Sequence, residues 1–254
     1  MIILFTSLKT KEEVERMHEA GRLLSDCHKE IKKLIRPGVT TMEIDAFVEE
    51  YLKKHGATAE QKGYQGYPYA TCASVNDVVC HGFPTTDPLK DGDIVTIDFV
   101  VNLNGWLADS AWSYAVGSIS EEAADLIDAA EKALYKGIEQ AKVGNRIGHI
   151  ANAIETYANE RGYSVVKDFI GHGIGQTIHE FPMVPHFGPI EQGPVLKEGM
   201  VITIEPMLNC GEYFVYVEED GWTARTVDGE LSAQFEHTVA ITKKGPIVLT
   251  NQYR

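Results

Sequence analysis

Two stretches of this chain spell nearly the same β-strand. LKDGDIVTID (Leu89–Asp98) recurs as LKEGMVITIE (Leu196–Glu205), with Leu, Lys, Gly, Thr and Ile in the same positions and a carboxylate at the end of each copy. Internal repetition indicates a fold that is assembled from similar structural units. A chain that repeats itself in this way is expected to fold into two similar halves.

Further pairs occur in the same order in both halves. PGVTTMEIDAFVEEYLKKHG (Pro37–Gly56) parallels VGNRIGHIANAIETYANERG (Val143–Gly162), and HGFP at His81 parallels HEFP at His179. Each short match is weak evidence by itself, but matches that share one order and a similar offset are hard to explain by chance. They indicate a pseudo-two-fold domain in which equivalent residues, including the two terminal carboxylates, meet near the axis.

Helices and antiparallel strands make up the predicted structure. Thr10 and Thr40 begin capping boxes of the form Thr-x-x-Glu, and Ser120 with two following glutamates begins a third helix. Gly56 and Gly162 are expected to stop two helices. Alternating runs rich in Val, Ile and Thr predict strands at residues 93–101, 109–117, 200–208, 213–219 and 233–242. The pattern is α+β, with helices on one face of an antiparallel sheet.

Several strands carry an acid on the face opposite their apolar side chains. Side chains alternate along a strand, and this alternation identifies four such acids: Asp98, Asp109, Glu205 and Glu236. A single strand acid is usually exposed to solvent. Four of them, together with His172 between two glycines, indicate a cluster, which repels itself unless cations or protons neutralise it. Carboxylates with an imidazole suit a pair of divalent ions such as Mn, Fe, Co or Zn.

Composition narrows the classes that remain. A length of 254 residues with 44% hydrophobic content fits one large globular domain or two smaller ones. The net charge of −14 opposes binding to phosphate backbones, so we expect no specific nucleic-acid site. Four cysteines without C-x-x-C spacing argue against disulfides and a zinc–thiolate site. The first residues, MIILFTSLKTKEE, lack the features of a signal peptide or membrane anchor, so a cytoplasmic protein without membrane attachment is expected.

Five motifs resemble those of the type I methionine aminopeptidases of bacteria, and the resemblance covers essentially the whole chain. They are VNDVVCHGFP, DGDIVTIDF followed by GWLADSA, GHGIGQTIHEFP, EGMVITIEPM and LSAQFEHTVAIT. The resemblance implies the pita-bread fold, a pseudo-two-fold duplicated antiparallel sheet that is covered by helices. It also implies one catalytic domain over residues 1–254, with halves at roughly 11–117 and 118–245.

The resemblance implies a site that holds two divalent metal ions. The family positions of Asp109 and Glu236 bridge the metals, Asp98 serves one ion, and His172 with Glu205 serves the other. Cobalt, manganese, iron and zinc all accept such ligands.

The resemblance also implies catalytic and substrate-binding residues. Glu205 would act as general base and proton shuttle, His179 would stabilise the oxyanion, and His81 would guide the scissile nitrogen. An apolar pocket for methionine, with His81 at its edge, would be lined by Tyr64, Tyr67, Cys72 and Trp222.

The sequence departs from the family pattern near this pocket. A common cysteine is replaced near Gln61, Ile178 stands where an aromatic residue is common, and Phe181 stands where many relatives carry glutamate. Five other histidines are interpreted as ordinary structural residues, namely His18, His28, His55, His149 and His237, and His186 is left undecided.

The implied activity is metal-dependent removal of the initiator methionine from nascent proteins and peptides that have a small second residue. Water activated by the two ions would be the nucleophile. A monomer is expected, with the ribosome surface as a candidate partner. An X-Pro aminopeptidase or prolidase-like peptidase is one alternative, although such relatives usually carry a large preceding domain. A non-enzymatic binding protein of the same fold is another, although such proteins typically lose ligands that are all present here.

Overall fold

The structure is a computed structural model that describes residues 6–253. The expectation of a start without a signal peptide or anchor depends partly on residues 1–5, which lie outside the described residues. Within residues 6–253, no helix combines the length and apolar character that crossing a bilayer requires.

Local sequence signals define the four α-helices of the described chain. They are α1 (Lys11–Leu34), α2 (Thr41–Lys54), α3 (Glu121–Ile138) and α4 (Ile147–Glu160). Both predicted capping boxes form, because Thr10 and Thr40 each accept a hydrogen bond from a glutamate N–H and donate their own N–H to that glutamate's carboxylate. Ser120 caps α3 through its hydroxyl. The predicted stops after α2 and α4 are also confirmed, since Gly56 and Gly162 adopt positive φ angles of 72° and 83°.

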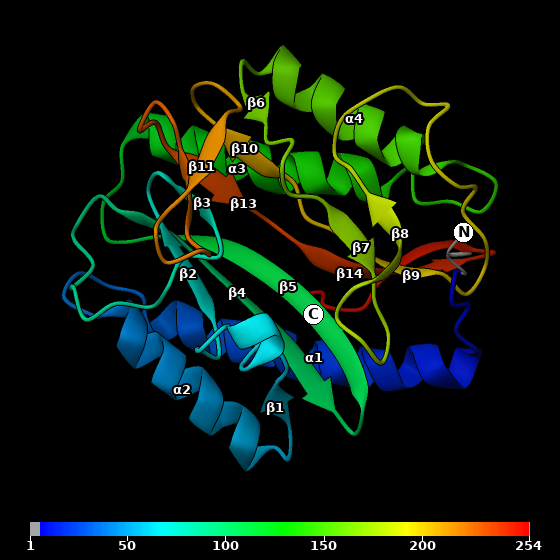
Figure 1. Ribbon diagram of the computed structural model, residues 1–254, viewed down its shortest axis with the longest axis horizontal. Coiled ribbons are helices and arrows are strands. Elements are labelled where there is room, and N and C mark those ends of the chain that lie inside the picture. The colour runs from blue at the N-terminus through cyan, green and yellow to red at the C-terminus, as the bar shows by residue number, and fades with distance from the viewer. Residues whose placement is uncertain (1–5, 254) are drawn as a thin grey trace.

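The strands form four antiparallel sheets, which Figure 1 shows with the helices. A four-stranded sheet contains β1 (Thr58–Ala59), β2 (Cys72–Val75), β4 (Ile94–Leu103) and β5 (Trp106–Ala115), and a short helix η1 (Tyr64–Gly66) lies between β1 and β2. A five-stranded sheet contains β7 (Gly171–Gly173), β8 (Glu180–Val184), β9 (Val201–Ile204), β14 (His237–Thr242) and β15 (Gly245–Val248). The two three-stranded sheets are β13 (Ser232–Gln234), β10 (Met207–Asn209) and β6 (Ser164–Val165), and β11 (Val215–Val217), β12 (Ala224–Thr226) and β3 (Val78–Cys80).

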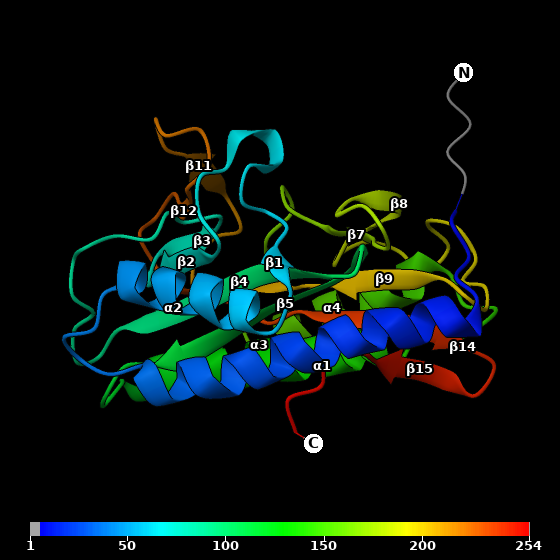
Figure 2. The same cartoon turned by 90° about the horizontal axis from the view of Figure 1, so that it is seen from below.

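The helices cover one side of the strands and leave the other side to loops. In Figure 2, α1 runs along the lower side of the sheets, while η1, β8 and β11 rise above the upper side. One apolar core joins the helices to the sheets, with Leu24 of α1, Leu134 of α3 and Ile97 of β4 each fully buried in it. The predicted α+β class and the antiparallel pairing are confirmed. The division into halves at residues 11–117 and 118–245 stays a prediction.

Two predicted strands are interrupted, and the interruptions face each other. The run at 200–208 divides into β9 and β10, and the run at 233–242 divides into β13 and β14. β9 pairs with β14 in the five-stranded sheet, and β10 pairs with β13 in a three-stranded sheet. The two segments therefore change sheets next to each other, at Glu205 and at Glu236. The prediction of continuous strands was therefore wrong at Glu205 and Glu236. Pro206, which has no N–H for a strand ladder, follows Glu205 at one of these breaks.

Side-chain hydroxyls and one backbone hydrogen bond join β5 to the segment between β13 and β14. The Glu236 N–H donates to the Ala111 carbonyl at 2.9 Å, and the Ser110 hydroxyl donates to the Glu236 carbonyl at 2.7 Å. Thr238 Oγ1 accepts from the Asp109 N–H at 2.9 Å and donates to the Asp109 carbonyl at 2.8 Å. The backbones of Asp109 and Glu236 are thereby held next to each other.

Candidate metal centre

A cavity of 360 Å³ lies at the two strand breaks, with Glu205 and Glu236 in its lining. It is lined by every residue that the sequence suggested for the metal site and the substrate pocket: Tyr64, Tyr67, Cys72, His81, Asp98, Asp109, His172, His179, Glu205, Trp222 and Glu236. These residues come from distant parts of the chain, so the fold alone brings them together.

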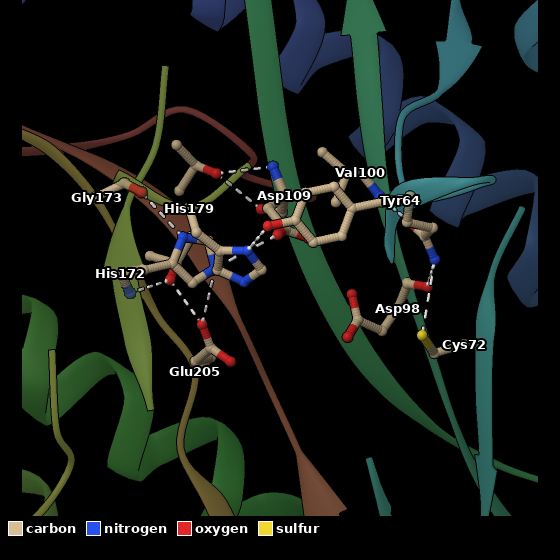
Figure 3. Close-up of polar contacts among 12 residues, drawn as sticks. Tyr64, Cys72, Asp98, Val100, Asp109, His172, Gly173, His179 and Glu205 are labelled. Carbon is tan, nitrogen blue, oxygen red and sulfur yellow. Dashed lines mark hydrogen bonds and ion pairs between the residues drawn. The ribbon is translucent and has the colours of Figure 1, made fainter. Parts of the chain in front are cut away.

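Carboxylates and an imidazole share the lining of the cavity, and Figure 3 shows four of these residues, Asp98, Asp109, His172 and Glu205. Asp109, His172 and Glu236 each offer one ligand atom, and these atoms all lie within 4.8 Å of one another. His172 Nε2 is 3.9 Å from Asp109 Oδ2 and 3.6 Å from Glu205 Oε1. Asp98 lies close enough to Asp109 and Glu205 for their charges to affect its ionisation.

The glycines beside His172 let its strand approach its neighbours. A Cβ on Gly171 would lie 2.6 Å from the Thr203 carbonyl oxygen, and a Cβ on Gly173 would lie 2.6 Å from the Phe181 carbonyl oxygen. His172 Nδ1 donates to the Gly173 carbonyl at 3.0 Å, so the ring proton is on Nδ1 and the Nε2 lone pair is free. The Nε2 atom of the Gly-flanked histidine is therefore available to a metal ion.

Thr203 connects His172 to Glu205. Its Oγ1 accepts from the His172 N–H at 2.9 Å and donates to Glu205 Oε1 at 2.7 Å. The alternation of β9 gave a signal for this contact, because Thr203 and Glu205 are two residues apart on the same face.

Burial changes the ionisation of the whole cluster. It raises the pKa of Asp109 to about 7 and that of Glu205 to about 8, and the Asp109 charge adds to the rise at Glu205. Burial, followed by the charges of neighbouring acids, raises the pKa of Asp98 and that of Glu236 well above their usual values. Burial lowers the pKa of His172 to about 3, with the nearby His179 adding to the effect, so this imidazole is neutral and able to coordinate.

The donor set fits a divalent cation. Among the described residues, Asp109 Oδ1 and Glu236 Oε1 are buried carboxylate oxygens without a hydrogen-bond partner. A buried, unpartnered carboxylate oxygen costs free energy unless a cation or proton meets it. Hard oxygen donors with one imidazole match Mn, Fe, Co or Zn.

Stabilisation of the protein by a divalent ion is expected to increase with pH. Because the pKa values of Asp109 and Glu205 are raised, the metal-free folded state keeps protons that the unfolded state has lost. The contribution of these two carboxyl groups to stability is therefore present at low pH and lost as the pH rises through about 7 for Asp109 and about 8 for Glu205. A cation replaces those protons. The rise in Tm on adding Mn²⁺, roughly 2–4 °C for each kcal/mol of added stability, should therefore grow across this pH range.

Differential scanning fluorimetry with and without Mn²⁺, from below pH 7 to above pH 8, measures this effect. Asp109→Asn is the matched control, since it removes one of the titrating carboxylates with little change in shape, and it should flatten the pH dependence. A Mn²⁺-induced rise that is the same at every pH would contradict the ionisation of the site described above.

Two further histidines border the cavity. Tyr64 OH lies 2.8 Å from His179 Nδ1, and the His179 ring lies 4.3 Å from the His172 ring. His81 has a positive φ of 55°, which is uncommon for a residue with a side chain, and its ring packs edge-on against Trp222 at 6.1 Å. Burial lowers the pKa of His81 to about 4, so His81 is neutral at physiological pH.

An apolar wall adjoins these histidines. The Tyr67 ring is buried and packs edge-on against Trp222 at 5.0 Å. Cys72 lies opposite Asp98 in the β2–β4 register, and burial raises the pKa of its thiol, which stays protonated. Of the residues that depart from the family pattern, Ile178 lines the cavity, whereas Phe181 lines a neighbouring apolar groove of 510 Å³.

His186 is a residue whose role the sequence left undecided. It is fully buried, and its Nε2 accepts from the Glu205 N–H at 3.1 Å, so it fixes the backbone of an acid at the strand break. The two residues are nineteen positions apart, and no spacing or motif indicated the contact. His28 and His237, interpreted as structural, are fully buried and hydrogen-bonded to Tyr114 and Thr250, and neither lines the cavity.

Comparison with known proteins yields consistent matches. The model of metallopeptidase family M24 matches residues 15–243. Methionine aminopeptidase 1 of Bacillus subtilis is 48% identical, over 95% of this chain and 98% of that protein. Methionine aminopeptidase of Clostridium perfringens is 51% identical, over 96% of this chain and 98% of that protein.

Solved structures give the same result for the fold. The crystal structure of methionine aminopeptidase from Rickettsia prowazekii is similar with a TM-score of 0.96 and 40% identity, and covers 97% of this chain and 100% of that one. Prolidase from Pyrococcus furiosus is similar with a TM-score of 0.78 and 27% identity, and the match covers 97% of this chain and 66% of that one. The predicted pita-bread fold is confirmed.

Proposed function

The chain belongs to metallopeptidase family M24. From its similarity to methionine aminopeptidases over nearly their whole length, we infer that it is a methionine aminopeptidase, an enzyme that hydrolyses the bond after an N-terminal methionine. The relatives named methionine aminopeptidase match over nearly their whole length, whereas the prolidase leaves about a third of its chain unmatched. At the site, the inference depends on one observation: the same cavity is lined by all five acid and imidazole residues of the cluster and by an apolar wall. The prolidase-like alternative is therefore disfavoured, and a binding protein that had lost its ligands would not explain the cluster.

We propose that five residues hold two divalent ions, namely Asp98, Asp109, His172, Glu205 and Glu236. The unpartnered buried oxygens of Asp109 and Glu236 support their assignment as residues that would hold these ions. When bound, the ions would supply Lewis acidity, which makes water a better nucleophile and polarises the scissile carbonyl.

Glu205 is proposed to move the proton during hydrolysis. Its Oε1 accepts the Thr203 hydroxyl, which leaves Oε2 to take a proton from the attacking water and pass it to the leaving amine. Its backbone is fixed by His186, so the carboxylate keeps its place during the transfer.

His179 and His81 are proposed to bind the reacting peptide group. With Tyr64 donating to His179 Nδ1, the ring proton is on Nε2, from which it can be donated to the developing oxyanion. His81 is neutral and therefore able to form a hydrogen bond with the scissile nitrogen without carrying a charge.

The apolar wall is proposed to select the first residue. Tyr64, Tyr67, Cys72 and Trp222 offer an apolar surface to an unbranched thioether side chain. We further propose that the substrates are nascent polypeptides with a small second residue, and that the ribosome surface is a candidate partner. We also propose that the protein is a cytoplasmic monomer.

The purified protein, supplemented with Mn²⁺ or Co²⁺, is expected to release free methionine from Met-Gly-Met-type peptides and to leave X-Pro peptides intact. A chelator should abolish release, and adding back the ion should restore it. Chromatographic detection of free amino acids measures this directly. Cleavage of X-Pro peptides alone would move the protein to the prolidase group, and no turnover with any divalent ion would contradict an enzymatic function.

A further inference from the structure

The edge of β4 has a gap beside Asp98. β5 pairs with one edge of β4 along its whole length. On the other edge, β2 pairs with residues 95–98 and β1 pairs with residues 101–102. The Glu60 N–H donates to the Val100 carbonyl at 2.9 Å, and beyond Glu60 the segment that follows β1 no longer pairs with β4. The β4 peptide groups between the residues paired with β1 and those paired with β2 therefore need another partner.

The side-chain amide of Gln61 fills this gap. The Val100 N–H donates to Gln61 Oε1 at 2.6 Å, and Gln61 Nε2 donates to the Asp98 carbonyl at 3.2 Å. The amide thus offers one acceptor and one donor to the edge of β4, as the peptide group of a neighbouring strand would. Gln61 is only 8% exposed, so water has little access to replace either bond.

The same amide belongs to the wall of the cavity. Its Nε2 lies 3.7 Å from Cys72 Sγ, and Gln61 lines the cavity together with Asp98. Figure 3 labels Asp98, Val100 and Cys72 on the same side of the site. One side chain therefore contacts both the backbone that carries a proposed metal ligand and the surface proposed to bind methionine.

We propose that Gln61 is a positioning residue for Asp98: by holding the β4 backbone at residues 98 and 100, it fixes the direction from which the Asp98 carboxylate meets a divalent ion. The proposal rests on the proposed metallopeptidase function. Groups that orient metal ligands without touching the metal typically change its affinity about 10–100-fold when removed. Asparagine is one methylene too short to reach both partners, and glutamate would place a carboxylate oxygen against the Asp98 carbonyl.

Gln61→Met tests the proposal, because methionine conserves the volume of the wall and removes both hydrogen bonds. In metal-free protein, hydrogen exchange is measured for the amides of residues 95–102. The Val100 amide should exchange about tenfold faster, because the variant removes its buried hydrogen-bond acceptor. Calorimetric titration with Mn²⁺ should show affinity that is about 10–100-fold weaker. Gln140→Met, two residues past the end of α3 and outside the cavity lining, is the control and should leave both measurements unchanged.

Kinetics separate positioning from simple reshaping of the wall. At saturating Mn²⁺, Gln61→Met should lower kcat more than it raises KM for a Met-initiated peptide. Unchanged Mn²⁺ affinity, or a change confined to KM, would overturn the proposal. If Gln61→Met does not fold, judged by its circular dichroism spectrum, Gln61→Asn takes its place with the same expected results. Exchange and Mn²⁺ binding need no substrate, so failure of the peptidase assay would not be confused with failure of this inference.

Discussion

Replacing Glu205 by glutamine is expected to lower kcat for Met-initiated peptides by about 10²–10⁴-fold, the usual contribution of a positioned general base. Glutamine keeps the size of the side chain and can still accept the Thr203 hydroxyl, but it cannot take a proton from water. Steady-state release of methionine at saturating Mn²⁺ measures the effect. Glu198→Gln, which changes an acid that faces solvent and pairs with Lys243, is the matched control and should leave kcat unchanged.

The metal content of the Glu205→Gln protein distinguishes its two proposed roles. Loss of activity with bound metal retained would assign the effect to proton transfer, and parallel loss of both would assign it to metal binding. Turnover within a few-fold of the unchanged protein under metal-replete conditions would show that Glu205 has neither role.

Replacing His179 by alanine is expected to lower kcat by about 10²–10³-fold, as removal of one oxyanion donor does in other hydrolases. KM and metal content should change little, because His179 is exposed at the cavity and is not among the proposed ligands. Tyr64→Phe should have a smaller effect in the same direction, since it removes only the hydroxyl that orients the imidazole. Methionine release over a range of peptide concentrations measures both constants.

His55→Ala is the control for this comparison. His55 is an exposed histidine just past the end of α2, bonded to the Tyr51 carbonyl and absent from the cavity lining. A kcat for His179→Ala that matches that of the control would remove His179 from the mechanism.

The sequence predicts those features that depend on nearby residues. The capping boxes at Thr10 and Thr40 form because the donor and acceptor are three residues apart. The acid of β4 was placed correctly relative to its apolar neighbours, since Ile97 and Phe99 are fully buried while Asp98 faces the cavity. The duplicated H-x-F-P motifs indicated that His81 and His179 belong to one site, and both line the cavity.

Features that depend on tertiary contacts could not be predicted in this way. Pro206 marks a possible break in the run 200–208. Nothing in the run 233–242 shows a break, and neither run shows that its two parts join different sheets, because that depends on how the two segments pair. The contact between His186 and the Glu205 backbone joins segments whose separation is set by the fold. Gln61 could be recognised only as a departure from the family pattern, since its partners Asp98 and Val100 lie across a strand edge.

The shared break in β9–β10 and β13–β14 has a mechanical consequence. Glu205 and Glu236 lie where two sheets meet and where the strand ladders are interrupted, so contacts with His186, Ser110 and Ala111 replace the ladder bonds there. An ion held by these two acids together with Asp109 and His172 would act as a brace between the sheets. Occupancy of the site would then add one more link across this junction, between residues of both sheets.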